Sequence, residues 1–301
     1  MGLSMKASEV FSDCQITRDF DFAIFGRTAS DIVGTCTYLY DAQYVKQTNQ
    51  NDSLCGVITT QALSTKIQNR LGLIIADDPA GVFFSAYHRN VLEMRQHMAP
   101  TYIHPTAVVA PHAIIAEQGV VVGAGTVIED GVIIKSGVEI GENSVIRSGA
   151  ILGGEGYEIK TINGIPSIVA HGDKVVIGNH VEIQYNTCVD KGFLGRDTRI
   201  GDFVKIDNLT SIAHGVYIGA HSKIAAKVII AGRVTIGSHV WVGPGCVISN
   251  AISIGDRAKI TIGSTIVSNV PEETVFTGYF AIEHSKFLKQ YYTALLAKAK
   301  V

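Results

Sequence analysis

The chain has 301 residues, 47% of them hydrophobic, with 25 basic and 27 acidic side chains. This charge balance argues against a nucleic-acid-binding surface, which needs an excess of basic residues to neutralise phosphates. No run of 18 apolar residues and no signal-peptide core occur, and five widely spaced cysteines lack a C-x-x-C pair. We therefore expect no membrane span, reduced thiols and a cytoplasmic location.

Residues 1–100 are predicted to form a small α/β domain. Four short apolar runs, rich in β-forming residues and separated by polar breaks, predict strands at 22–25, 36–40, 54–58 and 71–75. Pro79 opens a segment from Ala80 to Met98 in which apolar residues recur at helical spacing. Proline is common in the first turn of a helix, so a helix is expected here.

A six-residue repeat dominates the chain after a boundary at residues 100–105. Isoleucine or valine occupies nearly every sixth position from Ile103 to Ile266, with interruptions at 153–176 and 191–199. This period fits neither a helix nor an isolated strand, but is typical of a parallel β-helix in which three hexads make one triangular coil. The roughly 24 hexads predict about eight coils, in a mainly β domain over residues 101–275.

Residues 276–301 are predicted to form a helix. Their apolar side chains recur at helical spacing, at Phe287, Leu288, Tyr291, Leu295 and Leu296. Because the last coil of a solenoid would otherwise expose its core, we expect this helix to cap the end of the repeat.

The hexad count places both interruptions beside one histidine. His214 is the third residue of the hexad that starts at Ile212, and Gly232 takes the third position one coil later, roughly 4.8 Å away along the stack. Counting backwards, Val189 lies under Ile212 and Leu152 under Val189. Both interruptions therefore leave the solenoid at the corner of His214, which predicts a walled site.

A histidine at such a site is suited to general-base catalysis, because a neutral imidazole accepts a proton near neutral pH. A carboxylate on its other ring nitrogen would fix the tautomer. Asp207 is the first candidate for this partner, and Asp190 is the alternative; a turn carboxylate is an equally good interpretation of Asp207. The Gly232 amide is positioned to face a developing oxyanion. A structural corner residue is the alternative interpretation of His214.

The other histidines serve as an internal control. Four of them take the fourth, outward hexad position, namely His112, His180, His221 and His239, and His171 lies within the first interruption. No pair of histidines has the five-residue spacing of zinc-dependent hexapeptide enzymes. No metal is therefore expected.

Three segments resemble one family. The motif D-N-x-x-x-I-A-H-x-V-x-I-G, from Asp207 to Gly219, resembles the active-site segment of the UDP-3-O-acylglucosamine N-acyltransferases of lipid A synthesis. Residues 181–192 are similar to the preceding coil of that family. Residues 36–44, C-T-Y-L-Y-D-A-Q-Y, with Asp78-Pro79 before the helix, are similar to its uridine-binding domain. The resemblance covers nearly the whole chain.

The resemblance implies a left-handed β-helix, a homotrimer and transfer of an acyl group to the amine of a UDP-linked amino sugar. The donor would be an acyl thioester, on acyl carrier protein or coenzyme A, held between neighbouring subunits, with no bound cofactor. His214 would be the general base, Asp207 its orienting partner and Gly232 the oxyanion donor. The residues implied in substrate binding are Tyr38, Asp41, Tyr44, Asn208, Asp190 and Asn250.

The sequence departs from the family pattern at three positions. The asparagine of the uridine motif is Asp41 here, its lysine is Gln43, and a second histidine expected above His214 is Ala251. Two other functions fit the same fold. One is an acetyl-CoA-dependent acetyltransferase acting on a nucleotide-linked amino sugar for surface polysaccharide, and the other is a non-enzymatic scaffold.

Overall fold

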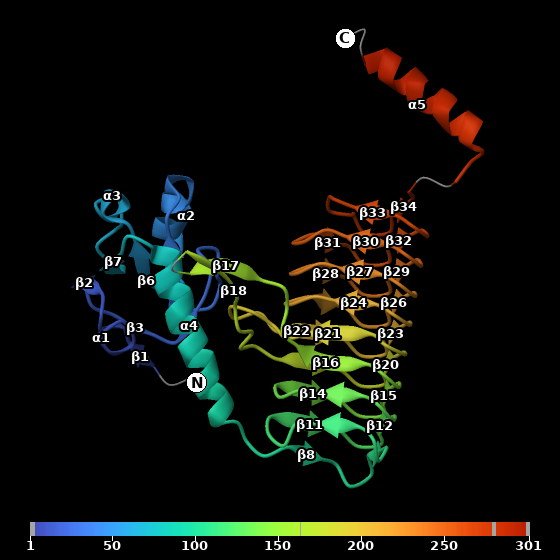
Figure 1. The fold of residues 1–301 in the computed structure, drawn as a ribbon, viewed down its shortest axis with the longest axis horizontal. Coiled ribbons are helices and arrows are strands. Elements are labelled where there is room, and N and C mark those ends of the chain that lie inside the picture. The colour runs from blue at the N-terminus through green and yellow to red at the C-terminus, as the bar shows by residue number, and fades with distance from the viewer. Residues whose placement is uncertain (1–3, 163, 279–280, 299–301) are drawn as a thin grey trace.

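The computed structural model of the protein describes residues 4–162, 164–278 and 281–298. Figure 1 shows an N-terminal domain beside a tall stack of short strands, with a hairpin of the stack reaching toward the domain.

The N-terminal domain is built on a five-stranded sheet in the order β2-β7-β6-β5-β4, in which only β2 is antiparallel to its neighbour. Its strands are β2 (Gln15–Arg18), β4 (Ile24–Phe25), β5 (Thr35–Leu39), β6 (Leu54–Thr59) and β7 (Gly72–Ile75). A second, two-stranded sheet pairs β1 (Met5–Lys6) with β3 (Asp21–Phe22). The predicted strands are therefore present, and the edge strand β2 was not anticipated.

The predicted helix is α4 (Pro79–Gln96), which packs its buried phenylalanines against the sheet. Asp78 caps it, because its Oδ1 accepts the N–H of Gly81 at 2.9 Å. The other helical segments of the domain are short: α1 (Ala7–Val10), η1 (Ala42–Tyr44), α2 (Val45–Gln50) and α3 (Gln61–Ser64).

The solenoid has three parallel sheets, which form the faces of a triangular prism. Face 1 consists of β8 (Tyr102–Ile103), β11 (Val120–Val122), β14 (Val138–Ile140), β19 (Val175–Ile177), β22 (Thr198–Ile200), β25 (Tyr217–Ile218), β28 (Thr235–Ile236) and β31 (Ser253–Ile254). Face 2 consists of β9 (Val108–Val109), β12 (Val127–Ile128), β15 (Val145–Ile146), β20 (Glu182–Ile183), β23 (Lys205–Ile206), β26 (Lys223–Ile224), β29 (Trp241–Val242), β32 (Lys259–Ile260) and β34 (Val275–Phe276). Face 3 consists of β10 (Ile114–Ile115), β13 (Ile133–Ile134), β16 (Ile151–Gly154), β21 (Cys188–Asp190), β24 (Ser211–Ile212), β27 (Ile229–Ile230), β30 (Val247–Ile248) and β33 (Thr265–Ile266).

The hexad residues point inward and fill the prism. Ile206, Ile212 and Ile218, one from each face, are at most 1% exposed, and they belong to a single apolar cluster that runs along the solenoid. The predicted alignment is confirmed, since Leu152 pairs with Val189 and Val189 with Ile212. Six residues thus supply one short strand and one corner, and three such units close a coil.

The outward corner histidines form a stacked column. His180, Phe203, His221 and His239 succeed one another with ring centroids 4.8 Å apart and nearly parallel planes. Each has a positive φ between 56° and 61°, which turns the chain from one face to the next. The three histidines of this column and His112 are exposed, as predicted for the outward hexad position.

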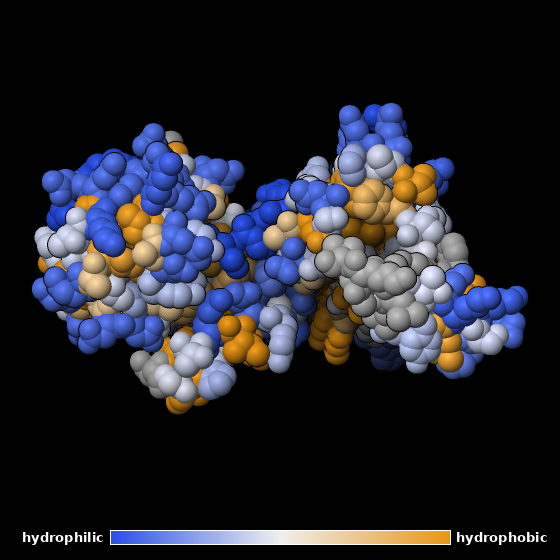
Figure 2. Space-filling view, turned by 90° about the horizontal axis from the view of Figure 1, so that it is seen from above, coloured by the Kyte–Doolittle hydropathy of each residue, from blue (hydrophilic) through white to orange (hydrophobic). Residues whose placement is uncertain are grey.

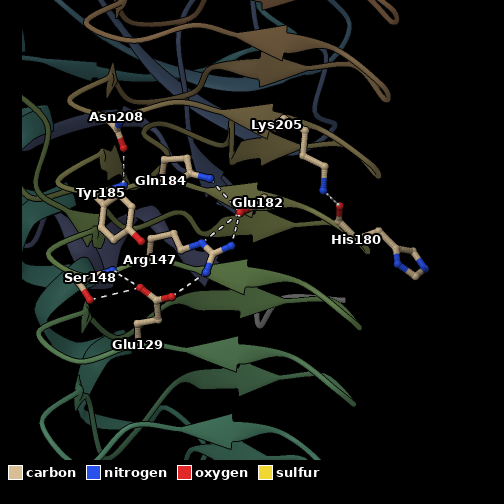
Figure 3. A network of polar contacts seen from close by, with 9 residues as sticks. All are labelled: Glu129, Arg147, Ser148, His180, Glu182, Gln184, Tyr185, Lys205 and Asn208. Carbon is tan, nitrogen blue, oxygen red and sulfur yellow. Dashed lines mark hydrogen bonds and ion pairs between the residues drawn. The ribbon is translucent and has the colours of Figure 1, made fainter.

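Polar side chains also join successive coils. Arg147 donates to Glu129 at 2.7 Å in the coil below and to Glu182 at 2.6 Å in the coil above, as Figure 3 shows. Such a bridge between two carboxylates ties three coils together at one corner.

The two interruptions leave the solenoid and contact the N-terminal domain. The first contains an antiparallel hairpin, β17 (Ile159–Ile162) and β18 (Ile165–Ile168), that lies next to α4 (Figure 1). Val169 from the first interruption and Phe193 from the second are 1% exposed, and both belong to the apolar core that contains Phe83 and Phe84 of α4. The solenoid therefore contributes part of the core of the N-terminal domain.

The C-terminal helix is α5 (His284–Lys298). It projects away from the last coil (Figure 1), and Phe287 and Tyr291 are about half exposed. The predicted helix is confirmed, but it does not cover the end of the solenoid as expected. Within the described residues, no helix has both the length and the apolar character that a membrane span requires.

Candidate active site

His214 follows β24 at the corner between faces 3 and 1, where the hexad count placed it. Its backbone carbonyl accepts the N–H of Arg233 at 2.9 Å, which fixes the corner to the coil above. A β-carbon added to Gly232 would lie 2.6 Å from His214 Nε2. The imidazole therefore lies against the backbone of Gly232, and the predicted one-coil contact is confirmed.

A cavity of about 770 Å³ opens in front of this histidine, between the solenoid and the N-terminal domain. Figure 2 shows the hollow between these two parts, bordered mainly by hydrophilic residues. The predicted site residues that line the cavity are Tyr38, Asp41, Tyr44, His214, Gly232 and Asn250. Residues from opposite ends of the chain are thus brought to one space.

A carboxylate from the first interruption faces His214. Glu158 Oε2 lies 3.8 Å from His214 Nε2, and the Glu158 side chain also pairs with Lys160 at 2.8 Å. Although burial raises the pKa of Glu158, Lys160, Arg27 and His214 bring it below its ordinary value. Glu158 is therefore an anion beside the imidazole at neutral pH.

The pKa of His214 is lowered to about 4, first by burial and then by the neighbouring His171, while Glu158 acts in the opposite direction. Its side chain is only 11% exposed. At neutral pH the imidazole is therefore uncharged and able to accept a proton.

The rear of the imidazole is enclosed by both interruptions. The His171 ring lies 5.2 Å from the His214 ring at an interplanar angle of 64°, and the Phe193 ring lies 5.8 Å from it at 76°. His171 is fully buried, and burial lowers its pKa. The prediction that the two interruptions wall the corner of His214 is confirmed.

The far end of the cavity lies in the N-terminal domain. Tyr38 and Tyr40 stack with ring centroids 6.1 Å apart, and Tyr38 also packs on Phe83. Asp41 Oδ1 accepts the backbone N–H of Gln43 at 3.0 Å, so the two departures from the family motif contact each other.

Three cations also line the cavity, namely Arg27, Lys160 and Arg233, and the charges of Arg27 and Arg233 act on His214. Burial and the nearby Arg27 and Arg196 lower the pKa of Arg233 to about 10, so it remains charged at neutral pH. The buried Nε of Arg27 has no hydrogen-bond partner among the described residues. This part of the cavity is suited to an anionic group.

Three of the predicted site residues, Asp207, Asn208 and Asp190, do not line this cavity. Asp207 and Asn208 follow β23, at the corner between faces 2 and 3, where Asp207 borders a separate groove with Trp241. Asn208 accepts the N–H of Tyr185 at 3.1 Å (Figure 3). Asp190 lies beside Gly154, and burial followed by the charge of Glu155 raises its pKa to about 6. Within one chain, therefore, Asp207 does not orient His214, because the two residues occupy different corners.

Sequence reasoning missed four residues that line the cavity, namely Arg27, Glu158, Lys160 and Arg233, and the buried His171 behind the His214 ring. The hexad count located the interruptions, but the path of the first interruption follows no repeat. Arg233 could have been predicted from the sequence, because it comes directly after Gly232 on the predicted corner.

The solenoid and its corner site define a hexapeptide-repeat transferase. The family model "Bacterial transferase hexapeptide (six repeats)" matches residues 119–154 and 197–232. A UDP-3-O-acylglucosamine N-acyltransferase of Delftia acidovorans is 33% identical over 84% of this chain and 78% of its own length. The chain belongs to the UDP-3-O-acylglucosamine N-acyltransferase family. The predicted parallel β-helix of hexapeptide repeats is confirmed.

Other relatives match over shorter stretches. A protein of the same name from Pseudomonas fluorescens is 51% identical over 30% of this chain, and this match spans a quarter of that protein's length. The structure of LpxA from Acinetobacter baumannii is 26% identical and covers 63% of this chain and 75% of its own, with a TM-score of 0.49.

Proposed function

We propose that the protein transfers an acyl group from an acyl thioester to the amine of a UDP-linked amino sugar, with His214 as general base. One observation carries this proposal: a single cavity joins an uncharged, buried histidine on the solenoid to stacked tyrosines on the N-terminal domain. The Delftia relative, whose printed name is UDP-3-O-acylglucosamine N-acyltransferase, supports the same reaction.

The nucleotide would occupy the end of the cavity formed by the N-terminal domain. Tyr38, Tyr40 and Tyr44 offer ring faces and edges to a uracil. The diphosphate would then lie beside Arg27 and Arg233, because arginine matches phosphate oxygens in charge and geometry. This orientation directs the sugar toward His214 and Asn250.

The chemistry follows from the placement of His214 Nε2. This atom takes a proton from the acceptor amine as the amine nitrogen bonds to the thioester carbonyl carbon. The oxygen of the tetrahedral intermediate carries the negative charge, and the Gly232 N–H donates to it. The intermediate then expels the thiolate, which takes the proton from His214, so the reaction requires no bound cofactor or metal.

The functional unit would be a homotrimer, joined through face 3. The first residue of each strand of this face points outward and is uncharged, and from the first coil to the last these residues are Ile114, Ile133, Ile151, Cys188, Ser211, Ile229, Val247 and Thr265. Asp190, at the end of β21, adds a carboxyl group at the edge of the face. Face 2, by contrast, presents Glu182, Lys205 and Lys223. Depletion of charge over an extended apolar face is typical of subunit contacts. The acyl chain, carried by acyl carrier protein or coenzyme A, would lie between subunits. The protein would act in the cytoplasm, where both donors are present.

Thiol release from acyl carrier protein or coenzyme A thioesters, measured with UDP-amino sugars as acceptors, tests the proposal. His214→Ala should lower kcat by roughly 10² to 10⁴. His221→Ala is the matched control, because His221 lies in the exposed histidine column. An unchanged rate in His214→Ala would exclude His214 as the general base.

Calorimetry with UDP, dTDP and GDP tests which nucleotide the protein binds. We expect a preference for UDP, and we expect Tyr38→Ala to abolish it. A preference for another nucleotide would refute the uridine assignment.

A further inference from the structure

Two buried ring nitrogens face each other behind the proposed base. His214 Nδ1 and His171 Nε2 are both buried, and neither has a hydrogen-bond partner among the described residues. A β-carbon added to Gly156 would lie 2.6 Å from His171 Nε2 and 3.0 Å from His214 Nδ1. Both atoms therefore approach one point beside Gly156.

The proton on His171 is fixed by its other nitrogen. His171 Nδ1 lies 2.9 Å from the carbonyl oxygen of Val169. A carbonyl only accepts hydrogen bonds, so Nδ1 carries a proton. Because His171 is fully buried and its pKa is lowered, the ring is neutral and its Nε2 presents a lone pair to His214.

Charged groups surround this pair on several sides. Glu155 lies 3.8 Å from His171 Nδ1, and it is neutralised by Arg95 at 2.6 Å and by the buried Lys191 at 3.0 Å. Glu158 approaches His214 from the cavity, and Arg27 and Arg233 lie beyond it. Among the described residues, no carboxylate makes a hydrogen bond to His214 Nδ1.

We propose that His171 is a positioning residue, which accepts a hydrogen bond from His214 Nδ1 and thereby leaves the lone pair of His214 on Nε2, toward the cavity. A carboxylate that accepts from the rear nitrogen of a catalytic histidine does the same, and here a neutral imidazole replaces it. The inference rests on the proposed function only in that it concerns the same histidine.

The anchoring of His171 supports this role. Its backbone N–H donates to Glu155 at 2.8 Å, and its carbonyl accepts from Arg95 of α4 at 3.0 Å. Its ring packs against Phe193 with a centroid distance of 4.8 Å. A ring held at its backbone, at Nδ1 and on one face has only Nε2 left to interact, and His214 lies on that side.

The test is the tautomer of His214, read by long-range ¹H–¹⁵N correlation on protein labelled with ¹⁵N-histidine at neutral pH. His214→Ala assigns the signal among the 10 histidines of the chain. The expected result is a proton on Nδ1. A proton on Nε2 would overturn the proposal, and this measurement requires no variant at His171.

Two substitutions separate positioning from mere structure. His171→Gln places an amide oxygen near the position of Nε2, whereas His171→Asn mimics Nδ1 alone and leaves His214 without an acceptor. We expect His171→Gln to retain the tautomer, and His171→Asn to lose it and to lower kcat about 10- to 100-fold at unchanged KM. An unchanged tautomer in His171→Asn would also refute the proposal. If no acyl transfer occurs but the proton is on Nδ1, the proposed function fails and this inference stands.

Discussion

Gly232→Ala tests the contact between the base and the coil above it. The added methyl group would lie 2.6 Å from His214 Nε2 and 2.7 Å from Cε1, closer than real β-carbons approach other atoms. The tip of the ring must therefore move by close to 1 Å to restore van der Waals contact. Phe193 and His171 enclose the rear of the His214 ring, so the ring cannot simply move backward. It must instead rotate, and Nε2 then leaves its present position beside Gly232.

The expected effect is on catalysis more than on folding. A displacement of about 1 Å in a reacting group costs on the order of 10²-fold in rate, which corresponds to about 2.7 kcal/mol of barrier. The overpacked methyl group costs roughly 1–3 kcal/mol of folding stability. We expect kcat for thiol release to fall about 100-fold while the folded protein persists at 25 °C.

The control is Gly245→Ala. Gly245 lies at a coil turn where no atom is within 4 Å of an added β-carbon, and its φ is +68°. Several coil turns of this chain carry non-glycine residues at similar φ, so this variant should fold with a modest loss of stability and keep its kcat. Wild-type kcat in Gly232→Ala would refute the placement of His214 Nε2 against Gly232.

Three further outcomes are expected. Glu158→Gln removes the carboxylate that raises the pKa of His214, so the acid limb of the kcat/KM profile should move below pH 4. The plateau of the profile should fall roughly 10-fold. An acid limb that does not shift would mean that Glu158 does not face the base. The pKa of His214 in the folded state, about 4, lies below its unfolded value of 6.5, so its stabilising effect is complete above pH 6.5 and is lost as the pH falls toward 4. Urea melts should therefore show up to about 3 kcal/mol less stability at pH 4, and a smaller decline in His214→Gln; equal declines would contradict the lowered pKa. Ile229→Asp places a charge at the middle of face 3 and should yield monomers in sedimentation velocity, whereas a persistent trimer would exclude this face as the subunit contact.

The solenoid followed from the sequence because its rule is local and repeats. Each hexad places one apolar residue inside, so the pairing of Leu152 with Val189 and the contact of His214 with Gly232 needed only counting. The same count separates Asp207 from His214, since one follows face 2 and the other face 3.

The interruptions were not predictable in this way. Glu158 and His171 lie in a segment without a repeat, and their positions depend on packing against the N-terminal domain. The C-terminal helix shows the same limit. Helical spacing predicts α5, but it contains no information about which surface, if any, the helix covers.

The shared apolar core has a consequence for how the molecule folds and how it can be divided. Val169 and Phe193 belong to the same cluster as Phe83 and Phe84, although they lie 85 to 110 positions further along the sequence. The interior of the N-terminal domain is therefore completed by side chains from the two interruptions of the solenoid. Removing residues 1–100 would expose Phe193 to water, and transplanting them to another solenoid would leave their own interior unfilled. A change in one part should thus alter the melting of the other, and both parts should unfold in a single transition.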